Sequence, residues 1–171
     1  RSLIACGDKE LAHYDEAVDR YQDIFRKCCM YRVEAYEGIR ELLEFLKSQG
    51  ILIAVLSNKP HPRTLDNVEG VFGKGYFNLV YGEREDKGIR KKPCPDGVWA
   101  IAEELGLSKS EILYLGDTNT DMETGDNAKV DTVGVTWGFR TREELMAFHP
   151  ALIADHPSRV VQYIKDVNGI E

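Results

Sequence analysis

The sequence predicts an α/β protein built on a doubly wound parallel sheet. Three observations lead to this expectation: apolar segments of strand length recur along the chain, amphipathic helical segments separate them, and several apolar segments end in polar residues. The segment ILIAVLSN, at 51–58, is continuously apolar before its polar end, as in a parallel strand that is buried on both faces. Strands that alternate with helices at such intervals are typical of βαβ units.

Two helices are expected before the first strand. Residues from about 9 to 29 carry apolar side chains at helical spacing, which predicts one long amphipathic helix. A second helix is expected from Gly38 to Ser48, and Gly50 follows it as a stop signal.

Helical periodicity lapses between these two helices, around residues 30–36. We therefore expect a domain boundary there. Residues 1–33 would form a separate helical part, and residues 34–171 would form the α/β core.

Strands and helices alternate through the rest of the chain. After the strand at 51–58 we expect a helix from about Pro62, a strand at 77–82, a helix at 96–105, a strand at 112–115, a helix after Asp121, strands at 132–136 and 152–155, and a closing helix from Ser158.

Composition limits the partners of this core. The formal net charge is -7 and the charges are interspersed, which argues against a nucleic-acid surface. The longest apolar run, residues 51–56, is far too short to cross a bilayer, and no basic-then-apolar leader opens the sequence. We therefore expect a cytoplasmic protein without a membrane partner, in which local donors hold any anionic ligand.

Polar groups stand at or near the carboxyl ends of the predicted strands, where open α/β sheets bind ligands. They are Ser57 and Asn58 in SNKP, Lys92 in KKPCPDG, and Asp117 and Asp121 in GDTNTD. Pro93 and Pro95, which follow Lys92, stiffen the backbone around it. These five residues form the candidate site.

Each of these residues also has a simpler structural interpretation. Asp117 follows a glycine and could belong to a turn or a helix cap. Ser57 and Asn58 could cap the next helix, and Lys92 could be an ordinary solvated lysine like its neighbour Lys91.

In order and spacing, SNKP, KPCPD and GDTNTD resemble the second, third and fourth motifs of the haloacid dehalogenase superfamily. The chain is most similar to the phosphoglycolate phosphatase type, and GVTWGF and the late LIAD also look like segments of that type. The resemblance implies a Rossmann-like core with a helical cap, of which residues 1–33 would be the C-terminal part.

The resemblance further implies a magnesium-dependent phosphatase that acts on a small phosphorylated metabolite through an aspartyl-phosphate. Ser57 would donate its hydroxyl to a phosphoryl oxygen, with Asn58 nearby, and Lys92 would neutralise charge. Asp117 would bind Mg²⁺, and Asp121 would be a further ligand or would accept from a metal-bound water.

The family's first motif, an Asp-x-Asp that supplies the nucleophile, is not found in these 171 residues. In the family it ends a central strand between those that carry Ser57 and Asp117. We expect an N-terminal segment outside this sequence, or a second copy, to complete the sheet, and we expect the chain alone to be inactive.

Two alternatives stay open. The protein could keep the fold but have lost catalysis, and then bind phosphate or regulate another protein. A receiver-like signalling domain shares the doubly wound sheet, but the acidic pair that it would need near its start is not found.

Overall fold

The computed structural model describes residues 13–28, 31 and 33–170. The chain divides into two units, Arg1–Val33 and Glu34–Glu171. This division falls within the stretch where helical periodicity lapses in the sequence. The interpretation of the first unit as part of a cap stays a prediction.

The described part of the first unit is the helix α2 (Tyr14–Cys28). Asp15 and Glu16 lie in its first turn, where negative charge interacts favourably with the helix dipole. The predicted long helix is confirmed over these residues, and positions 9–12 and 29 lie outside the described residues.

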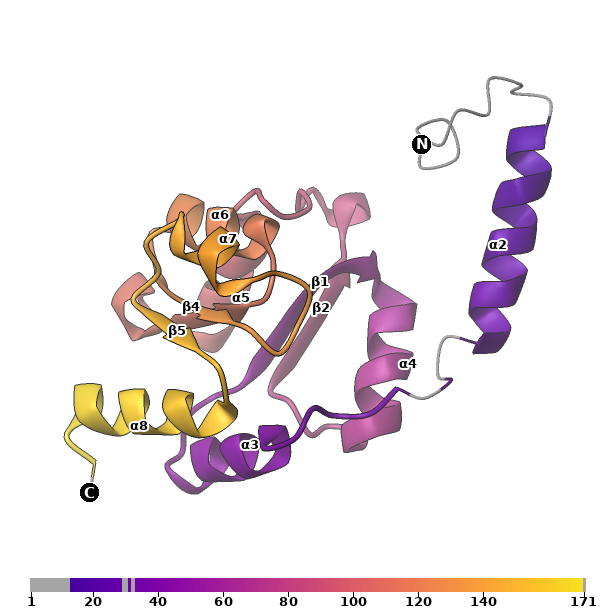
Figure 1. The fold of residues 1–171 in the computed structure, drawn as a ribbon. Coiled ribbons are helices and arrows are strands. Elements are labelled where there is room, and N and C mark those ends of the chain that lie inside the picture. The colour runs from indigo at the N-terminus through magenta and orange to yellow at the C-terminus, as the bar shows by residue number, and fades with distance from the viewer. Residues whose placement is uncertain (1–12, 29–30, 32, 171) are drawn as a thin grey trace. The chain divides into compact units, whose positions relative to one another are not determined.

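The second unit contains the alternating strands and helices (Figure 1). Its elements are α3 (Ile39–Ser48), β1 (Ala54–Pro60), α4 (His61–Phe72), β2 (Leu79–Glu83), η2 (Glu85–Lys87), α5 (Asp96–Leu105), η3 (Lys109–Glu111), β3 (Leu113–Gly116), α6 (Asn119–Ala128), β4 (Asp131–Val135), α7 (Arg142–Met146), β5 (Leu152–Ala154) and α8 (Pro157–Asn168). The α/β class is confirmed, and every element that we predicted from residue 38 onward is present.

All paired strands are parallel, but they form two separate sheets. In one sheet β1 pairs with β2, and in the other the order is β3-β4-β5. Among the described residues β1 and β3 therefore have one hydrogen-bonded neighbour each. Direct pairing between the strands of Ser57 and Asp117, which would have excluded the expected strand order, is not observed in this part of the chain.

The first strand differs from its prediction in extent and burial. It begins at Ala54 rather than Ile51, and it continues to Pro60. Ala54 is exposed, and 43% of Leu52 is accessible to solvent, so the expected burial on both faces is wrong for this chain. The physical reason is that β1 pairs with β2 alone among the described residues, so no neighbouring strand there covers the side chains along its other edge. Leu115 in β3 is likewise 37% exposed.

The hydrophobic core joins strands of the larger sheet to helices α3 and α8. In Figure 1, α3 and α8 lie along the lower side of β4 and β5, and α6 and α7 lie along the upper side. The buried members of this core are Leu42, Val133, Val135, Ala154, Val160 and Ile164. This packing fixes β4 between two layers of helices.

Candidate functional site

Ser57 and Asn58 are the fourth and fifth of the seven residues of β1, in the part where its register with β2 shifts. The Ser57 hydroxyl oxygen accepts a hydrogen bond from the Lys59 backbone N–H at 3.1 Å. The residue before α4 is Pro60, and no side chain caps this helix. The alternative that Ser57 or Asn58 is an N-cap is therefore wrong.

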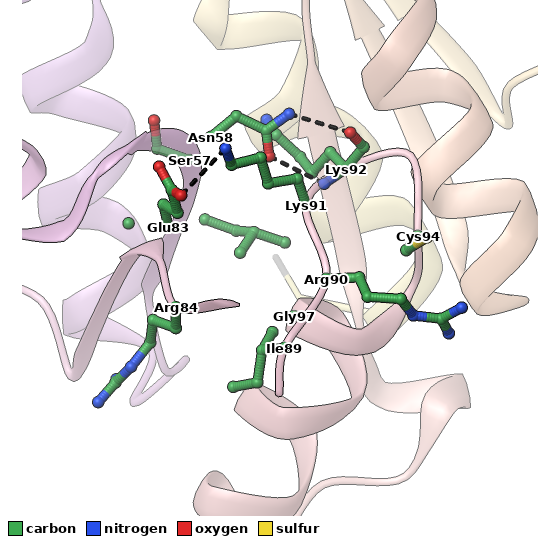
Figure 2. Close-up of a pocket in the computed structure, with 12 residues that line it drawn as sticks. Ser57, Asn58, Glu83, Arg84, Ile89, Arg90, Lys91, Lys92, Cys94 and Gly97 are labelled. Atoms are coloured by element: carbon green, nitrogen blue, oxygen red, sulfur yellow. Dashed lines mark hydrogen bonds and ion pairs between the residues drawn. The ribbon is translucent and has the colours of Figure 1, made fainter. Parts of the chain in front are cut away.

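Asn58 makes two hydrogen bonds to the backbone of Lys92, which precedes α5 (Figure 2). Its Oδ1 accepts from the Lys92 N–H at 2.8 Å, and its Nδ2 donates to the Lys92 carbonyl at 3.0 Å. The two residues are 34 positions apart, and both line the same small hollow as Ser57. The structure thus brings together the first two predicted motifs.

The ammonium of Lys92 contacts the third motif. Its Nζ lies 2.7 Å from Oδ1 of Asp121, and the two side chains are only 15% and 7% exposed. Lys92 is therefore not a solvated lysine. Lys91, in contrast, is 41% exposed and pairs with Glu83 and Glu85 at 3.0 and 3.3 Å.

Asp121 lies in the first turn of α6, at the third position after the N-cap Thr118. The prediction that this helix begins after Asp121 is wrong, because Thr118 and Asp121 form a capping box that starts the helix earlier. Oδ2 of Asp121 accepts from the Thr118 hydroxyl at 2.6 Å and from the Thr118 N–H at 3.2 Å. Oδ1 accepts from Lys92 and, at 3.1 Å, from the Tyr114 hydroxyl.

Opposing effects act on the pKa of Asp121. Burial favours the neutral acid, but the charge and hydrogen bond of Lys92, with hydrogen bonds from Thr118 and Tyr114, outweigh it and lower the pKa below its ordinary value. Burial, reinforced by the adjacent Asp121 carboxylate, raises the pKa of Tyr114. Asp121 is therefore an anion beside a neutral phenol.

Asp117 directly follows β3 and contacts the loop after β4. Its Oδ2 accepts a hydrogen bond from the Phe139 backbone N–H at 3.0 Å. The loop approaches so closely that a Cβ added at Gly138 would lie 2.1 Å from that oxygen. Thr118, not Asp117, caps α6, so the cap interpretation of Asp117 is wrong.

The two carboxylates differ in how well they fit magnesium. Mg²⁺ is usually held by one or two carboxylates together with substrate phosphate and water. Only Oδ2 of Asp117 accepts a hydrogen bond among the described residues, which leaves Oδ1 for a metal, so Asp117 fits. A carboxylate has about four acceptor positions, and four donors already contact Asp121.

Asp121 as a metal ligand stays a prediction, and in this arrangement a donor would have to move to permit it. Within the described residues no three His, Cys, Asp or Glu side chains cluster as a metal site.

Three contributors were not predicted from sequence: Tyr114, Thr118 and Phe139. Thr118 could have been found, since Thr-x-x-Asp after a strand is a capping signature. Tyr114 is the polar member of an otherwise aliphatic strand, which is a weaker signal. Phe139 contributes through its backbone N–H, so its side chain carries no sequence signal for this contact.

The fold and site define a class: parallel α/β proteins that present polar groups at the carboxyl ends of their strands. The model of the haloacid dehalogenase-like hydrolase family matches residues 4–135. The chain belongs to that family. Within the part of the chain that the structure describes, no helix combines the length and apolar character needed to span a bilayer.

Several curated proteins are similar to this chain. A phosphoglycolate phosphatase of Pectobacterium atrosepticum is 28% identical over 153 residues, which cover 90% of this chain and 64% of that protein. An N-acetylmuramic acid 6-phosphate phosphatase of Pseudomonas aeruginosa is 30% identical over 156 residues, which cover 87% of this chain and 64% of that protein. The chain thus spans just under two thirds of the length of these relatives.

Solved structures agree with the fold. A candidate phosphoglycolate phosphatase from Lactobacillus delbrueckii superposes with a TM-score of 0.82 at 28% identity, covering 91% of this chain and 64% of that one. A haloacid dehalogenase-like family protein from Streptococcus pneumoniae gives a TM-score of 0.80 at 22% identity, with 93% and 73% covered. The Rossmann-like core expected from the motifs is therefore confirmed.

Proposed function

We propose that the intact protein is a magnesium-dependent phosphatase that hydrolyses a small phosphomonoester, such as phosphoglycolate, through an aspartyl-phosphate intermediate. The observation that carries this proposal is the position of Lys92. Its backbone is held by Asn58 beside Ser57, and its ammonium is held by Asp121 in a largely buried position. A fixed cation of this kind suits phosphoryl transfer, which is served mainly by positioning and charge stabilisation.

The site residues have distinct roles in this proposal. The Ser57 hydroxyl donates to a phosphoryl oxygen, and the Lys92 ammonium offsets the negative charge shared by phosphate and nucleophile. Asp117 holds Mg²⁺ through its available oxygen, and the bound ion supplies positive charge to the phosphoryl group. Asp121 keeps the ammonium of Lys92 in place.

The nucleophile lies outside these 171 residues, which contain no Asp-x-Asp. We propose that it is carried by a parallel strand between β1 and β3, from an N-terminal segment of the same protein or from a second copy. The unpaired edges of the two sheets and the exposed Leu52 and Leu115 support this proposal. The chain alone is then inactive, and we place the protein in the cytoplasm with a small phosphorylated metabolite as its substrate.

Phosphate release by the intact protein tests the function. The substrate panel comprises phosphoglycolate, N-acetylmuramic acid 6-phosphate, pyrophosphate and p-nitrophenyl phosphate, with and without Mg²⁺. Lys92→Ala and Asp117→Ala should each lower turnover by about 100-fold or more, because each removes charge stabilisation of the transition state.

Lys91→Ala is the matched control, because this neighbouring lysine is exposed and its ion pairs within the described residues are with Glu83 and Glu85. Its turnover should stay within about twofold of the parent, since exposed ion pairs contribute little. Near-normal turnover in Lys92→Ala or Asp117→Ala would contradict the site assignment. Phosphate binding without turnover by the intact protein would instead indicate a binding or regulatory protein.

A further inference from the structure

The side-chain amide of Asn58 spans from β1 to the segment that carries Lys92. It makes hydrogen bonds to both backbone groups of Lys92, to the N–H at 2.8 Å and to the carbonyl at 3.0 Å (Figure 2). In Figure 2 the guanidinium groups of Arg84 and Arg90 point away from this contact. The partner of the amide in these two hydrogen bonds is the Lys92 backbone.

The chemistry of this contact selects asparagine. An amide has an acceptor oxygen and a donor nitrogen on the same short side chain. The Lys92 N–H needs the oxygen and the Lys92 carbonyl needs the nitrogen, so a flipped amide would lose both hydrogen bonds. An aspartate would set an oxygen against the carbonyl and keep one bond only.

The other end of Lys92 is fixed by its ion pair with Asp121. The lysine is thus held at two points, by its backbone and by its ammonium. Asn58 is exposed, so water competes with each single bond, but two bonds from one amide restrict both the position and the rotation of the Lys92 peptide.

We propose that Asn58 is a positioning residue whose amide fixes the backbone of Lys92 and thereby the place of its ammonium, rather than a side chain that contacts the phosphoryl group. This inference rests on the proposed function. It predicts that the effect of Asn58 on catalysis passes through Lys92.

A double-mutant cycle in the intact protein tests the inference. With p-nitrophenyl phosphate, Asn58→Ala should lower kcat by about 10- to 100-fold, the range expected when a catalytic group is misplaced by about 1 Å. In a Lys92→Ala background the same substitution should change kcat by less than about twofold, because the group that it positions is gone. Asn58→Asp should resemble Asn58→Ala.

Hydrogen exchange gives a second readout that does not require activity. The Lys92 amide should exchange about tenfold faster in Asn58→Ala, which corresponds to the loss of one hydrogen bond of about 1.4 kcal/mol. Asn78→Ala is the matched control. It also removes a hydrogen bond between a side-chain amide and the backbone, because Oδ1 of Asn78 accepts from the Ile53 N–H at 2.9 Å, but Asn78 lies next to the amino end of β2. It should leave kcat and Lys92 exchange unchanged.

Equal losses of kcat from Asn58→Ala with and without Lys92 would overturn the inference, as would unchanged exchange of the Lys92 amide. If the intact protein hydrolyses no phosphate ester, the proposed function fails. Faster Lys92 exchange in Asn58→Ala would in that case still support the contact as the restraint on Lys92.

Discussion

At the scale of single residues, the contact between Lys92 and Asp121 dominates the site. Both side chains are largely buried, and Asp121 is the carboxylate paired with the Lys92 ammonium. Removing one partner of such a pair leaves an uncompensated charge. We expect Asp121→Ala to lower the free energy of unfolding of the intact protein by about 3–5 kcal/mol in urea denaturation.

The control is Asp126→Ala, on the same helix, where the carboxylate is 73% exposed. This substitution should lower the free energy of unfolding by less than about 1 kcal/mol, because exposed ion pairs contribute little to stability. Adding Lys92→Met to Asp121→Ala should recover part of the loss by removing the buried charge. Equal stability of Asp121→Ala and Asp126→Ala would contradict this account of the pair.

Gly138 lies directly against the side chain of Asp117. A Cβ at this position would lie 2.1 Å from Oδ2 and 2.4 Å from Cβ of Asp117, so the carboxylate or the loop must shift in Gly138→Ala. We expect magnesium affinity to fall by about 10- to 100-fold, as for other substitutions that disturb the support of a metal ligand. Isothermal titration of the intact protein with Mg²⁺ measures this.

Gly75→Ala is the comparison for Gly138→Ala. No atom lies within 4 Å of the Cβ that it adds, although its φ of +70° strains the backbone. It should therefore lower stability but leave magnesium affinity unchanged. Unchanged affinity in Gly138→Ala as well would indicate that Asp117 is not the ligand.

The sequence was sufficient to name Lys92, Asp117 and Asp121, because residue type and spacing carry that information. It could not predict which side chains they contact. The Asn58 contact joins residues 34 positions apart, and the phenol of Tyr114 meets Asp121 only because β3 and α6 fold against each other. The ion pair between Asp121 and Lys92 is likewise known only from such distances, and the role of Asp121 as a metal ligand stays a prediction.

At the scale of elements, the start of α5 is stabilised by Arg90. Asp96 is the first residue of the helix. Nε of Arg90 donates to its Oδ2 at 2.7 Å, and Nη2 of Arg90 donates to its Oδ1 at 2.8 Å. These bonds are the main reason why the pKa of Asp96 lies below its ordinary value of 3.8. A lowered pKa means that the carboxylate favours the folded state above that value, and that this stability is lost as the pH falls below it.

We therefore expect Asp96→Asn to lower the thermal midpoint of the intact protein at pH 7, with a difference from the parent that shrinks below pH 4. Thermal melts between pH 3 and 7 measure it. Asp126→Asn removes the exposed pair with Lys129 and should change little at any of these pH values. A constant difference between Asp96→Asn and the parent across the range would show that the carboxylate charge is not responsible.

Among the helices, the ten-residue α5 was predicted with its observed bounds, whereas the five-residue α7 was not predicted. The range of α5 agrees with its prediction, because apolar spacing and Pro95 mark it clearly. The five-residue α7 is shorter than two turns and shows no period, although the Thr141–Glu144 capping box starts it. The late start of β1 could not be foreseen, since apolar composition does not report which neighbours a strand has.

At the scale of the whole molecule, the division of the strands into two sheets is the feature to test. If another strand joins β1 and β3 in the intact protein, their backbone amides should exchange more slowly there than in the 171-residue chain. Hydrogen-exchange mass spectrometry compares the two proteins directly. The strand β4 is the internal control, because it already pairs on both sides with β3 and β5.

Equal exchange of β1 and β3 in both proteins would contradict the added strand. The alternation of elements in the sequence was enough to predict the class of fold, and the motifs were enough to predict that the strands of Ser57 and Asp117 would not pair. The partial exposure of Leu52 and Leu115 could not be predicted from the sequence, because it depends on which parts of the protein cover each strand.

The division into two sheets also shows how the site is held together. Each sheet is built from consecutive elements, β1-α4-β2 in one and β3 to β5 with their helices in the other. Lys92 follows the strands of the first sheet, and Asp121 lies in the first helix of the second. Their ion pair therefore ties the two sheets together, and we expect it to form only when both sheets are folded against each other.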